Sequence, residues 1–232
     1  MSNFHFGINI SRNKIPKISR ETYATIDKRS SFYNDRLWKN STIFDEEYDN
    51  WKYEDKDHKI YSDQWCEQHQ KDALKNYDIN MHHCQQLNKE DFNKEIEKLK
   101  KSFPEFVEVD DLDEYDNLSG IYILILDEYK QMYRGQTSNI RQRIMHHWGS
   151  RKRFDRLIFG SIETSKISID SFGPLDTTRI LIMKLNIGEL FDREEEIVKT
   201  INNKYLLNRV EGGLGDTDDF SAIDLVSNIK SR

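Results

Sequence analysis

The sequence predicts a mixed α/β (α+β) chain built around a small sheet, and three observations lead to this prediction. Two apolar runs flank a polar turn within residues 120–134, which is typical of a β-hairpin. Residues 139–148 and 189–201 carry apolar side chains at helical spacing. A further apolar run, RILIMKL at 179–185, separates these two helices. The order strand, strand, helix, strand, helix indicates a small α/β layer.

The hairpin has a distinct turn between its two strands. Gly120 to Leu126 is apolar and β-branched, DEYK at 127–130 supplies the turn, and Gln131 to Arg134 can return as an antiparallel strand. Ser138 then stands where the N-cap of the next helix belongs. Arg143 and His147 are four residues apart in that helix, so one helix face presents both.

An amphipathic helix is expected upstream, at residues 89–103. Its apolar side chains recur at spacings of four, three and four, and they are Phe92, Ile96, Leu99 and Phe103. Asp91 is the expected N-cap, and Pro104 ends the helix. The first 90 residues read as short helices and loops packed by aromatic contacts among Trp38, Trp51, Tyr53, Tyr61 and Trp65.

Charge divides the chain near residue 118. The net charge is -6, but residues 1–118 hold 18 Lys+Arg against 25 Asp+Glu (-7), while residues 119–232 hold 17 against 16 (+1). An acidic stretch at 105–117 immediately precedes the apolar hairpin. We therefore expect an N-terminal helical or irregular extension at 1–118, a folded domain at 119–210 and a C-terminal tail at 211–232.

A basic cluster suggests contact with a phosphate backbone. Seven basic residues fall within 23 positions whose only acid is Asp155, and they are Arg134, Arg141, Arg143, Arg151, Lys152, Arg153 and Arg156. A solvated helix and loop that are basic for no functional reason would look the same.

The composition excludes a membrane protein and a disordered chain. Hydrophobic residues make up 36% and charged residues 33%, and no apolar run is long enough to span a bilayer. The N-terminus lacks the pattern of a secretion signal, so we expect a cytoplasmic location and reduced cysteines. A structural zinc site remains an alternative for one cluster, consisting of Cys66, His69, His82, His83 and Cys84.

The hairpin resembles the two motifs of the GIY-YIG nuclease superfamily. Gly120-Ile121-Tyr122 is followed by Tyr133-Arg134-Gly135, with Tyr133 eleven positions after Tyr122. Arg143 follows Tyr133 by ten positions and His147 lies one helical turn further, as the family pattern requires. The likeness covers residues 119–210, and Arg134 replaces the usual apolar residue of the second motif.

A later helix completes the resemblance. Glu194 precedes Ile197 and Val198 as the family's glutamate precedes its apolar pair, and Asn208 stands where the closing asparagine is expected. The resemblance implies a three-stranded antiparallel sheet flanked by helices, preceded here by a mostly helical extension. It also implies a DNA endonuclease that leaves 5′-phosphate and 3′-hydroxyl ends.

Each member of this set suits one task in phosphodiester hydrolysis. Tyr122 is the expected general base and Tyr133 supports the nucleophile through a hydrogen bond. Arg143 offers a planar, permanently charged fork for phosphate oxygens, and His147 can bond the attacking group or the phosphate. Glu194 is the expected ligand of one Mg²⁺ or Mn²⁺ ion, because such ions prefer hard oxygen donors. Helix phase turns Glu194 toward the sheet, and Glu195 and Glu196 toward solvent.

The leading functional hypothesis is a Mg²⁺-dependent, site-specific restriction-type DNA endonuclease with Asn208 completing its catalytic set. DNA is the expected partner, no membrane is expected, and a homodimer is left open. One alternative is a non-catalytic nucleic-acid-binding module that uses the same basic residues. Another is an RNA nuclease or a structure-selective repair nuclease.

Overall fold

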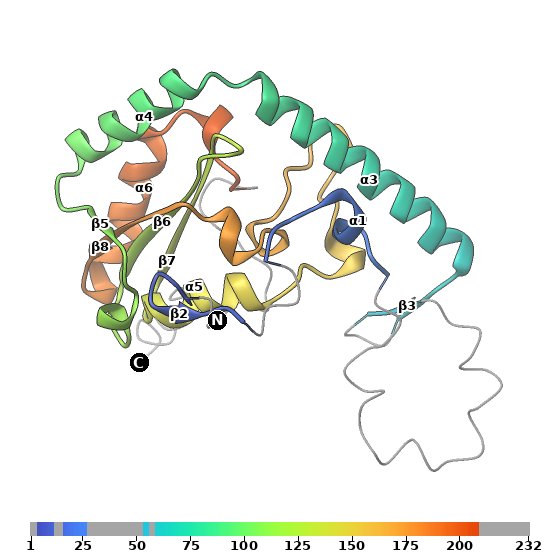
Figure 1. The fold of residues 1–232 in the computed structure, drawn as a ribbon, viewed down its shortest axis with the longest axis horizontal. Coiled ribbons are helices and arrows are strands. Elements are labelled where there is room, and N and C mark those ends of the chain that lie inside the picture. Colours follow the sequence, from blue (N-terminus) through green and yellow to red (C-terminus); the bar gives the residue numbers. More distant parts are fainter. Residues whose placement is uncertain (1–3, 12–15, 27–52, 56–58, 209–232) are drawn as a thin grey trace, which may run out of the picture. The chain divides into compact units, whose positions relative to one another are not determined.

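The computed structural model describes residues 4–11, 16–26, 53–55 and 59–208 (Figure 1). The chain divides into two compact units. The first unit comprises Met1–Ile18, Met81–Arg151 and Ser168–Arg232, and the second comprises Ser19–Asn80 and Lys152–Ile167. The predicted tail at 211–232 lies outside the described residues, as do Trp38 and Trp51.

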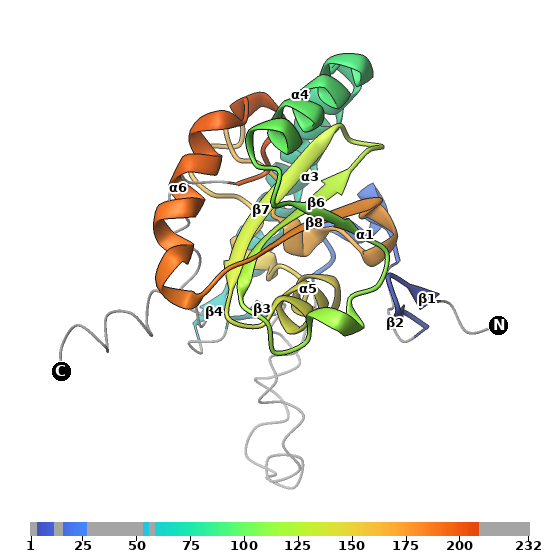
Figure 2. The same ribbon diagram turned by 90° about the vertical axis from the view of Figure 1, so that its left-hand side faces the viewer.

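The first unit is built on an antiparallel sheet with the strand order β5-β8-β6-β7 (Figure 2). Its strands are β5 (Val107–Val109), β6 (Gly120–Leu126), β7 (Gln131–Thr137) and β8 (Arg179–Lys184). The predicted hairpin is β6-β7, and β6 lies between β7 and β8. Mixed helix and antiparallel strand confirm the predicted α+β class.

The sheet has four strands where the resemblance implies three. The additional strand, β5, pairs with β8 and opposes Val107 to Ile182 and Val109 to Ile180. Since β5 lies before residue 118, the expected boundary there does not coincide with a division of the structure. The sheet unit begins well upstream of it.

Helices α4 (Lys89–Ser102) and α6 (Leu190–Thr200) cover one face of the sheet (Figure 2). Together with alternate residues of β6, β7 and β8 they enclose one apolar core, which includes Phe92, Ile96, Leu99, Ile121, Ile123, Ile125, Met132, Leu181, Met183, Leu190 and Ile197. The predicted apolar face of α4 is therefore confirmed. Its N-cap is Asn88 rather than Asp91, because the Asn88 side chain accepts a hydrogen bond from the Asp91 backbone N–H.

Helix α5 (Ile140–Gly149) covers the opposite face (Figure 2). Its N-cap is Asn139 rather than the predicted Ser138, because the extended Asn139 accepts a hydrogen bond from the Gln142 backbone N–H at 3.0 Å. Ile140 and Ile144 are buried beneath it, as helical spacing requires.

Shorter elements complete the first unit. A two-stranded ribbon is formed by β1 (Phe4–His5) and β2 (Ile8–Asn9). Five of the described 3-10 helices belong to this unit: Asp113–Tyr115, Ile169–Ser171, Pro174–Asp176, Ile187–Glu189 and Asn203–Tyr205.

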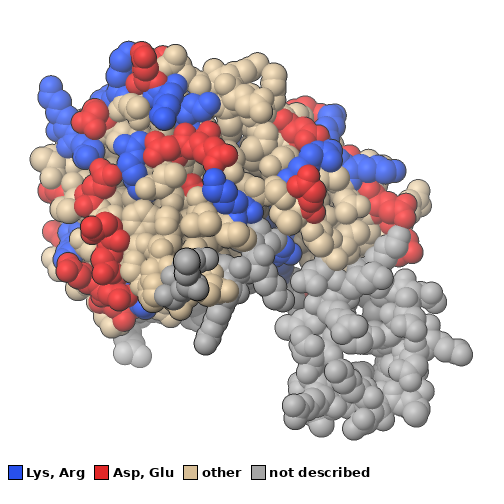
Figure 3. Space-filling view, viewed as in Figure 1, with Lys and Arg blue, Asp and Glu red and all other residues tan. Residues whose placement is uncertain are grey.

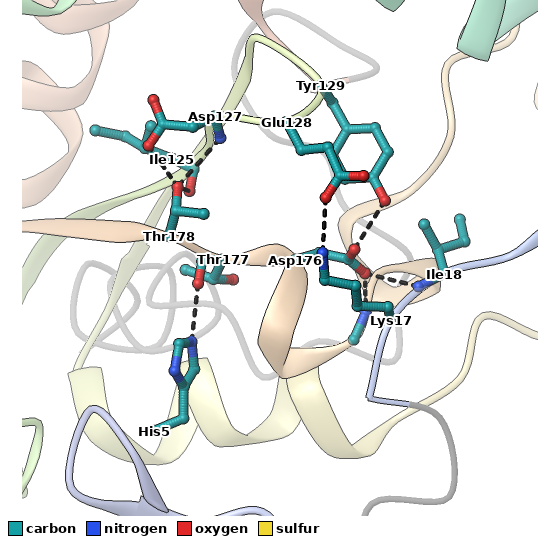
Figure 4. Close-up of polar contacts among 11 residues, drawn as sticks. His5, Lys17, Ile18, Ile125, Asp127, Glu128, Tyr129, Asp176, Thr177 and Thr178 are labelled. Atoms are coloured by element: carbon teal, nitrogen blue, oxygen red, sulfur yellow. Dashed lines mark hydrogen bonds and ion pairs between the residues drawn. The ribbon is translucent and has the colours of Figure 1, made fainter.

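One buried carboxylate ties the N-terminal segment to the sheet unit (Figure 4). Asp176 accepts hydrogen bonds from the backbone N–H of Ile18 at 2.8 Å, from the backbone N–H of Gly173 at 2.7 Å and from the Tyr129 hydroxyl at 2.8 Å. Burial raises the pKa of Asp176, and these hydrogen bonds oppose the rise. His5 adds a contact of 2.8 Å between its Nε2 and the backbone oxygen of Thr177. The first 18 residues are thus part of the sheet unit where they are described.

The second unit contains α1 (Arg20–Tyr23), β3 (Tyr53–Glu54), β4 (Ile60–Tyr61), a 3-10 turn at Phe154–Arg156 and most of α3 (Asp63–Gln86). The 24-residue α3 is much longer than the short helices expected in this region. The aromatic packing is confirmed for Tyr53, Tyr61 and Trp65: the ring centroids of Tyr61 and Trp65 lie 4.1 Å apart, and those of Tyr53 and Tyr61 lie 5.7 Å apart. None of the helices described is long and apolar enough to cross a membrane.

We predict that Asp176→Ala destabilises the protein by about 2–4 kcal/mol, because it leaves three donors without their acceptor in the interior. Urea unfolding followed by circular dichroism measures this change. Asp192→Ala, on the exposed side of α6, is the control and should change stability by less than about 0.5 kcal/mol. Equal stability of the two variants would contradict the role given to Asp176.

Candidate active site

A close approach between the two strands of the hairpin sets the position of Tyr122. Tyr122 on β6 pairs with Gly135 on β7. A Cβ atom at Gly135 would lie 2.2 Å from the Tyr122 hydroxyl oxygen, so only glycine lets the phenol ring lie across β7. Gly120 is under a similar constraint, because its Cβ would lie 2.2 Å from the backbone oxygen of Met183. Both glycines of the paired motifs are thus required by packing.

Tyr122 begins a chain of hydrogen bonds that crosses three elements. Its hydroxyl lies 2.7 Å from Nε2 of His147 on α5. Nδ1 of the same imidazole lies 2.5 Å from Oδ1 of Asp170 in the turn Ile169–Ser171. A carboxylate only accepts, so Nδ1 donates to Asp170, and in a neutral His147 ring Nε2 accepts a hydrogen bond from the Tyr122 hydroxyl. The chain of hydrogen bonds therefore runs from Tyr122 through His147 to Asp170.

Arg143 and Tyr133 surround the same phenol. Arg143 hydrogen-bonds Tyr122 from one turn before His147 on α5. The Tyr133 ring meets the His147 ring edge-on, with centroids 5.0 Å apart, and its centroid is 6.3 Å from that of Tyr122. The structure therefore brings together four of the residues singled out in the sequence.

Burial keeps Tyr122 protonated at neutral pH. Burial raises the pKa of Tyr122 well above its ordinary value, nearby Tyr133 raises it further, and the charge and hydrogen bond of Arg143 oppose the rise. Tyr122 is fully enclosed and His147 is only 1% exposed, whereas Tyr133 and Arg143 are partly exposed. The two partly exposed side chains thus link the buried phenol to the surface.

Glu194 lies on the other face of the sheet. It is buried on α6 with Leu190 and Ile197, while Glu195 and Glu196 are exposed, which confirms the predicted helix phase. Leu190 and Ile197 belong to the core beneath α4 and α6, whereas Tyr122 faces α5. Glu194 and the tyrosine–histidine pair therefore reach the edge strand β7 from opposite faces.

The partner of Glu194 is Arg134, which the sequence suggested as a nucleic-acid contact. Arg134 is 2% exposed, so it is a buried residue and not a surface contact. Its Nη2 lies 3.3 Å from Oε1 of Glu194, and its Nη1 donates to the Glu194 backbone oxygen at 3.1 Å. Burial raises the pKa of Glu194 and Arg134 opposes this rise, so the two charges stabilise each other.

Asn208 acts on the backbone of the same edge strand. Its side-chain oxygen accepts from the Arg134 backbone N–H at 3.1 Å, and its side-chain nitrogen donates to the Arg134 backbone oxygen at 2.8 Å. One amide thereby pairs both main-chain groups of an edge residue, as a neighbouring strand would. In this structure Asn208 positions β7, and its bonds are to the strand and not to the phenol.

Two oxygen groups on the α6 face are candidate ligands for a divalent ion. Glu194 offers a hard carboxylate, and the side-chain oxygen of Gln136, on the same face of β7, is buried without a partner among the described residues. No group of three His, Cys, Asp or Glu in that part of the chain is placed to hold a metal. Mg²⁺ keeps several waters, so one carboxylate suffices, but the ion would share Glu194 with Arg134.

The remaining basic residues are divided between the two units, and two of them are paired with acids. Arg141 pairs with Asp113, its Nε 2.9 Å from the carboxylate, and Arg156 pairs with its neighbour Asp155 at 3.3 Å. Arg151 ends a segment of the first unit, whereas Lys152, Arg153 and Arg156 belong to the second. Basic and acidic side chains are interspersed on the face drawn in Figure 3.

The zinc alternative is not supported by the described residues. Cys66 and Cys84 lie 18 residues apart in α3, which corresponds to about 27 Å along the helix axis. His69 is stacked on Trp65 and contacts the backbone oxygen of Phe154 at 2.8 Å, and His82 contacts Gln86. The cluster is close in sequence but is spread along one helix.

Asp170 is the one member of the hydrogen-bond chain that sequence reasoning missed. It lies in a short turn between α5 and β8, with no periodicity and no motif spacing that links it to His147. Only the folded chain shows the pairing, and an isolated acid in a loop gives no signal in a single sequence.

Comparison of the chain with models of protein families, with curated proteins and with solved structures gives no match.

We predict that Gly135→Ala lowers stability by about 1–3 kcal/mol, because the added methyl group overlaps the Tyr122 hydroxyl and forces the ring to move. Thermal or urea unfolding gives the size of the effect. Gly149→Ala is a matched control at the end of α5, where an added Cβ meets nothing within 4 Å. Its stability should stay equal or rise by up to about 1 kcal/mol, and a comparable loss in both variants would contradict the packing argument.

Proposed function

We propose that this chain is a GIY-YIG-type, metal-dependent DNA endonuclease. The observation that supports the proposal is the hydrogen bond of 2.7 Å from Tyr122 to His147, with Arg143 bonded to the same phenol. A strand tyrosine that served packing alone would need neither a histidine nor an arginine at its hydroxyl. The shape of the hairpin, with Gly135 making room for the ring, supports the same interpretation.

In the proposed reaction His147 takes the proton of Tyr122, and the resulting phenolate takes a proton from the attacking water. The hydroxide attacks phosphorus, the P–O3′ bond breaks, and the leaving 3′ oxygen takes a proton from solvent. Arg143 holds the phosphoryl oxygens, whose negative charge grows in the transition state. Tyr133, partly exposed beside His147, orients the water through its hydroxyl.

Glu194 is the residue proposed to hold Mg²⁺ or Mn²⁺, and the side-chain oxygen of Gln136 is a neutral oxygen donor on the same face of β7 as Arg134. A divalent ion supplies positive charge to the phosphoryl group and to the leaving oxygen. Arg134 favours the ionised form of the buried Glu194 carboxylate, which is the form that binds a metal ion. Arg134 also competes with the ion for Oε1, so metal affinity is expected to be modest.

DNA is the proposed substrate and site-specific, restriction-type cleavage the proposed mode. Discrete fragments from a large unmodified DNA would support site recognition, whereas a smear would contradict it. RNA or branched DNA offered in parallel separates the proposed enzyme from an RNA nuclease or a structure-selective repair nuclease.

Two observations favour a second candidate, a non-catalytic nucleic-acid-binding module. Tyr122 is fully enclosed, and Glu194 is already paired with Arg134. A water molecule reaches the Tyr122 hydroxyl only after the side chains around it move. If binding to nucleic acid does not cause that movement, the chain binds DNA without cutting it.

We predict that the purified protein cuts plasmid DNA only with Mg²⁺ or Mn²⁺, and that Glu194→Gln lowers cleavage at least about 100-fold. Glutamine keeps the size of the side chain but is a weaker metal ligand. DNA affinity, measured by fluorescence anisotropy, should stay equal or rise because one negative charge is removed.

Glu195→Gln is the matched control, because that neighbour is exposed on the same helix. It should cut like the wild type. Normal cleavage by Glu194→Gln would remove Glu194 from the metal site, and absence of cleavage by the wild type with any metal would leave the non-catalytic candidate.

A further inference from the structure

The imidazole of His147 can receive a proton only at the nitrogen that carries none. Its two nitrogens are 2.7 Å from the Tyr122 hydroxyl and 2.5 Å from the Asp170 carboxylate. In a neutral imidazole one nitrogen carries hydrogen and the other a lone pair, and the partner of the first decides which is which. Asp170 accepts only, so it selects hydrogen at Nδ1 and leaves the lone pair at Nε2.

We propose that Asp170 is a positioning residue that holds His147 in the tautomer able to take the proton of Tyr122. This inference rests on the proposed function, because it explains how a buried tyrosine can become a base. Asp170 contacts the imidazole of His147 through Oδ1. It acts through the imidazole.

The proposed transfer moves one proton from the Tyr122 hydroxyl to Nε2 of His147. The O–H bond of Tyr122 breaks, a bond from that proton to Nε2 forms, and His147 becomes an imidazolium that still donates to Asp170 through Nδ1. The phenolate then takes one proton from water, and the imidazolium later returns its proton to solvent. The negative carboxylate favours the imidazolium, since opposite charges attract strongly where water is largely excluded.

The surroundings support a dedicated role for Asp170. His147 is 1% exposed, whereas the Asp170 side chain is 26% exposed, so the carboxylate remains in contact with solvent while the imidazole is enclosed. The Ser168 hydroxyl lies 3.5 Å from the second carboxylate oxygen of Asp170. His146, the adjacent histidine on α5, is exposed and contacts Ser150 instead.

The tautomer can be observed without any substrate. Two-bond ¹H–¹⁵N correlations of labelled protein should assign hydrogen to Nδ1 of His147 in the wild type, at a pH where the ring is neutral. Asp170→Ala removes the acceptor, so the Nδ1–H signal pattern should give way to the Nε2–H tautomer that prevails in free histidine. An unchanged pattern would overturn the proposal whether or not the protein is a nuclease.

Steady-state cleavage of DNA with Mg²⁺ gives the second measurement. Asp170→Ala should lower kcat by about 100-fold with KM within about twofold, because proton transfer suffers and phosphate binding does not. Ser171→Ala is the matched control in the same turn, since its hydroxyl is buried without a partner among the described residues. It should leave kcat and the His147 tautomer unchanged.

Asp170→Asn is a second variant that can be measured if Asp170→Ala does not fold. The amide keeps the size of the side chain but loses the charge that favours the imidazolium, so kcat should again fall while KM holds. If the wild type cuts no nucleic acid, the proposed function is wrong. The NMR measurement of the His147 tautomer is then the remaining test of the role proposed for Asp170. A wild type that cuts, together with Asp170 variants that cut equally well, overturns the inference and leaves the proposed function in place.

Discussion

The packing of the Tyr122 ring across Gly135 is the constraint on which the candidate site depends. It carries the phenol toward the edge strand, where the hydroxyl meets His147 at 2.7 Å. The register of β6 and β7 follows from the same pairing, because a slip of one residue would place a side chain where the ring lies and would turn Tyr122 to the wrong face. The pair formed by Tyr122 and Gly135 therefore links the packing of the hairpin to the chain of hydrogen bonds.

Strand β7 is the meeting point of two sets of polar side chains. The α5 face carries the chain from Tyr122 through His147 to Asp170, and the α6 face carries the pair of Arg134 and Glu194. Asn208 holds the strand between them by pairing both backbone groups of Arg134. The ionic pair avoids an isolated buried carboxylate, which would be costly.

The spacing of apolar residues predicted the elements whose faces are buried in the core. It did not predict features that depend on a contact between two particular residues. The hairpin, the apolar face of α4 and the inward orientation of Glu194 all followed from spacing, because a core imposes a repeat. Strand β5 was not predicted because it has only three residues and lies within an acidic run. Val107 and Glu108 are exposed, so the sequence there shows no alternation of apolar and polar residues. Arg134 was taken for a surface residue because a strand arginine usually is one, and its partner Glu194 lies 60 residues away. Asp170 depends on a loop whose path no local rule predicts.

Tyr122→Phe deletes one oxygen atom and thereby tests whether the Tyr122 hydroxyl is a reacting group rather than a packing group. The measurement is the single-turnover rate of DNA cleavage with Mg²⁺, alongside DNA affinity and thermal stability. We expect cleavage to be at least about 100-fold slower and DNA affinity to be retained, because the ring still fills its place over Gly135. Cleavage at the wild-type rate by Tyr122→Phe would show that the Tyr122 hydroxyl takes no part in the reaction.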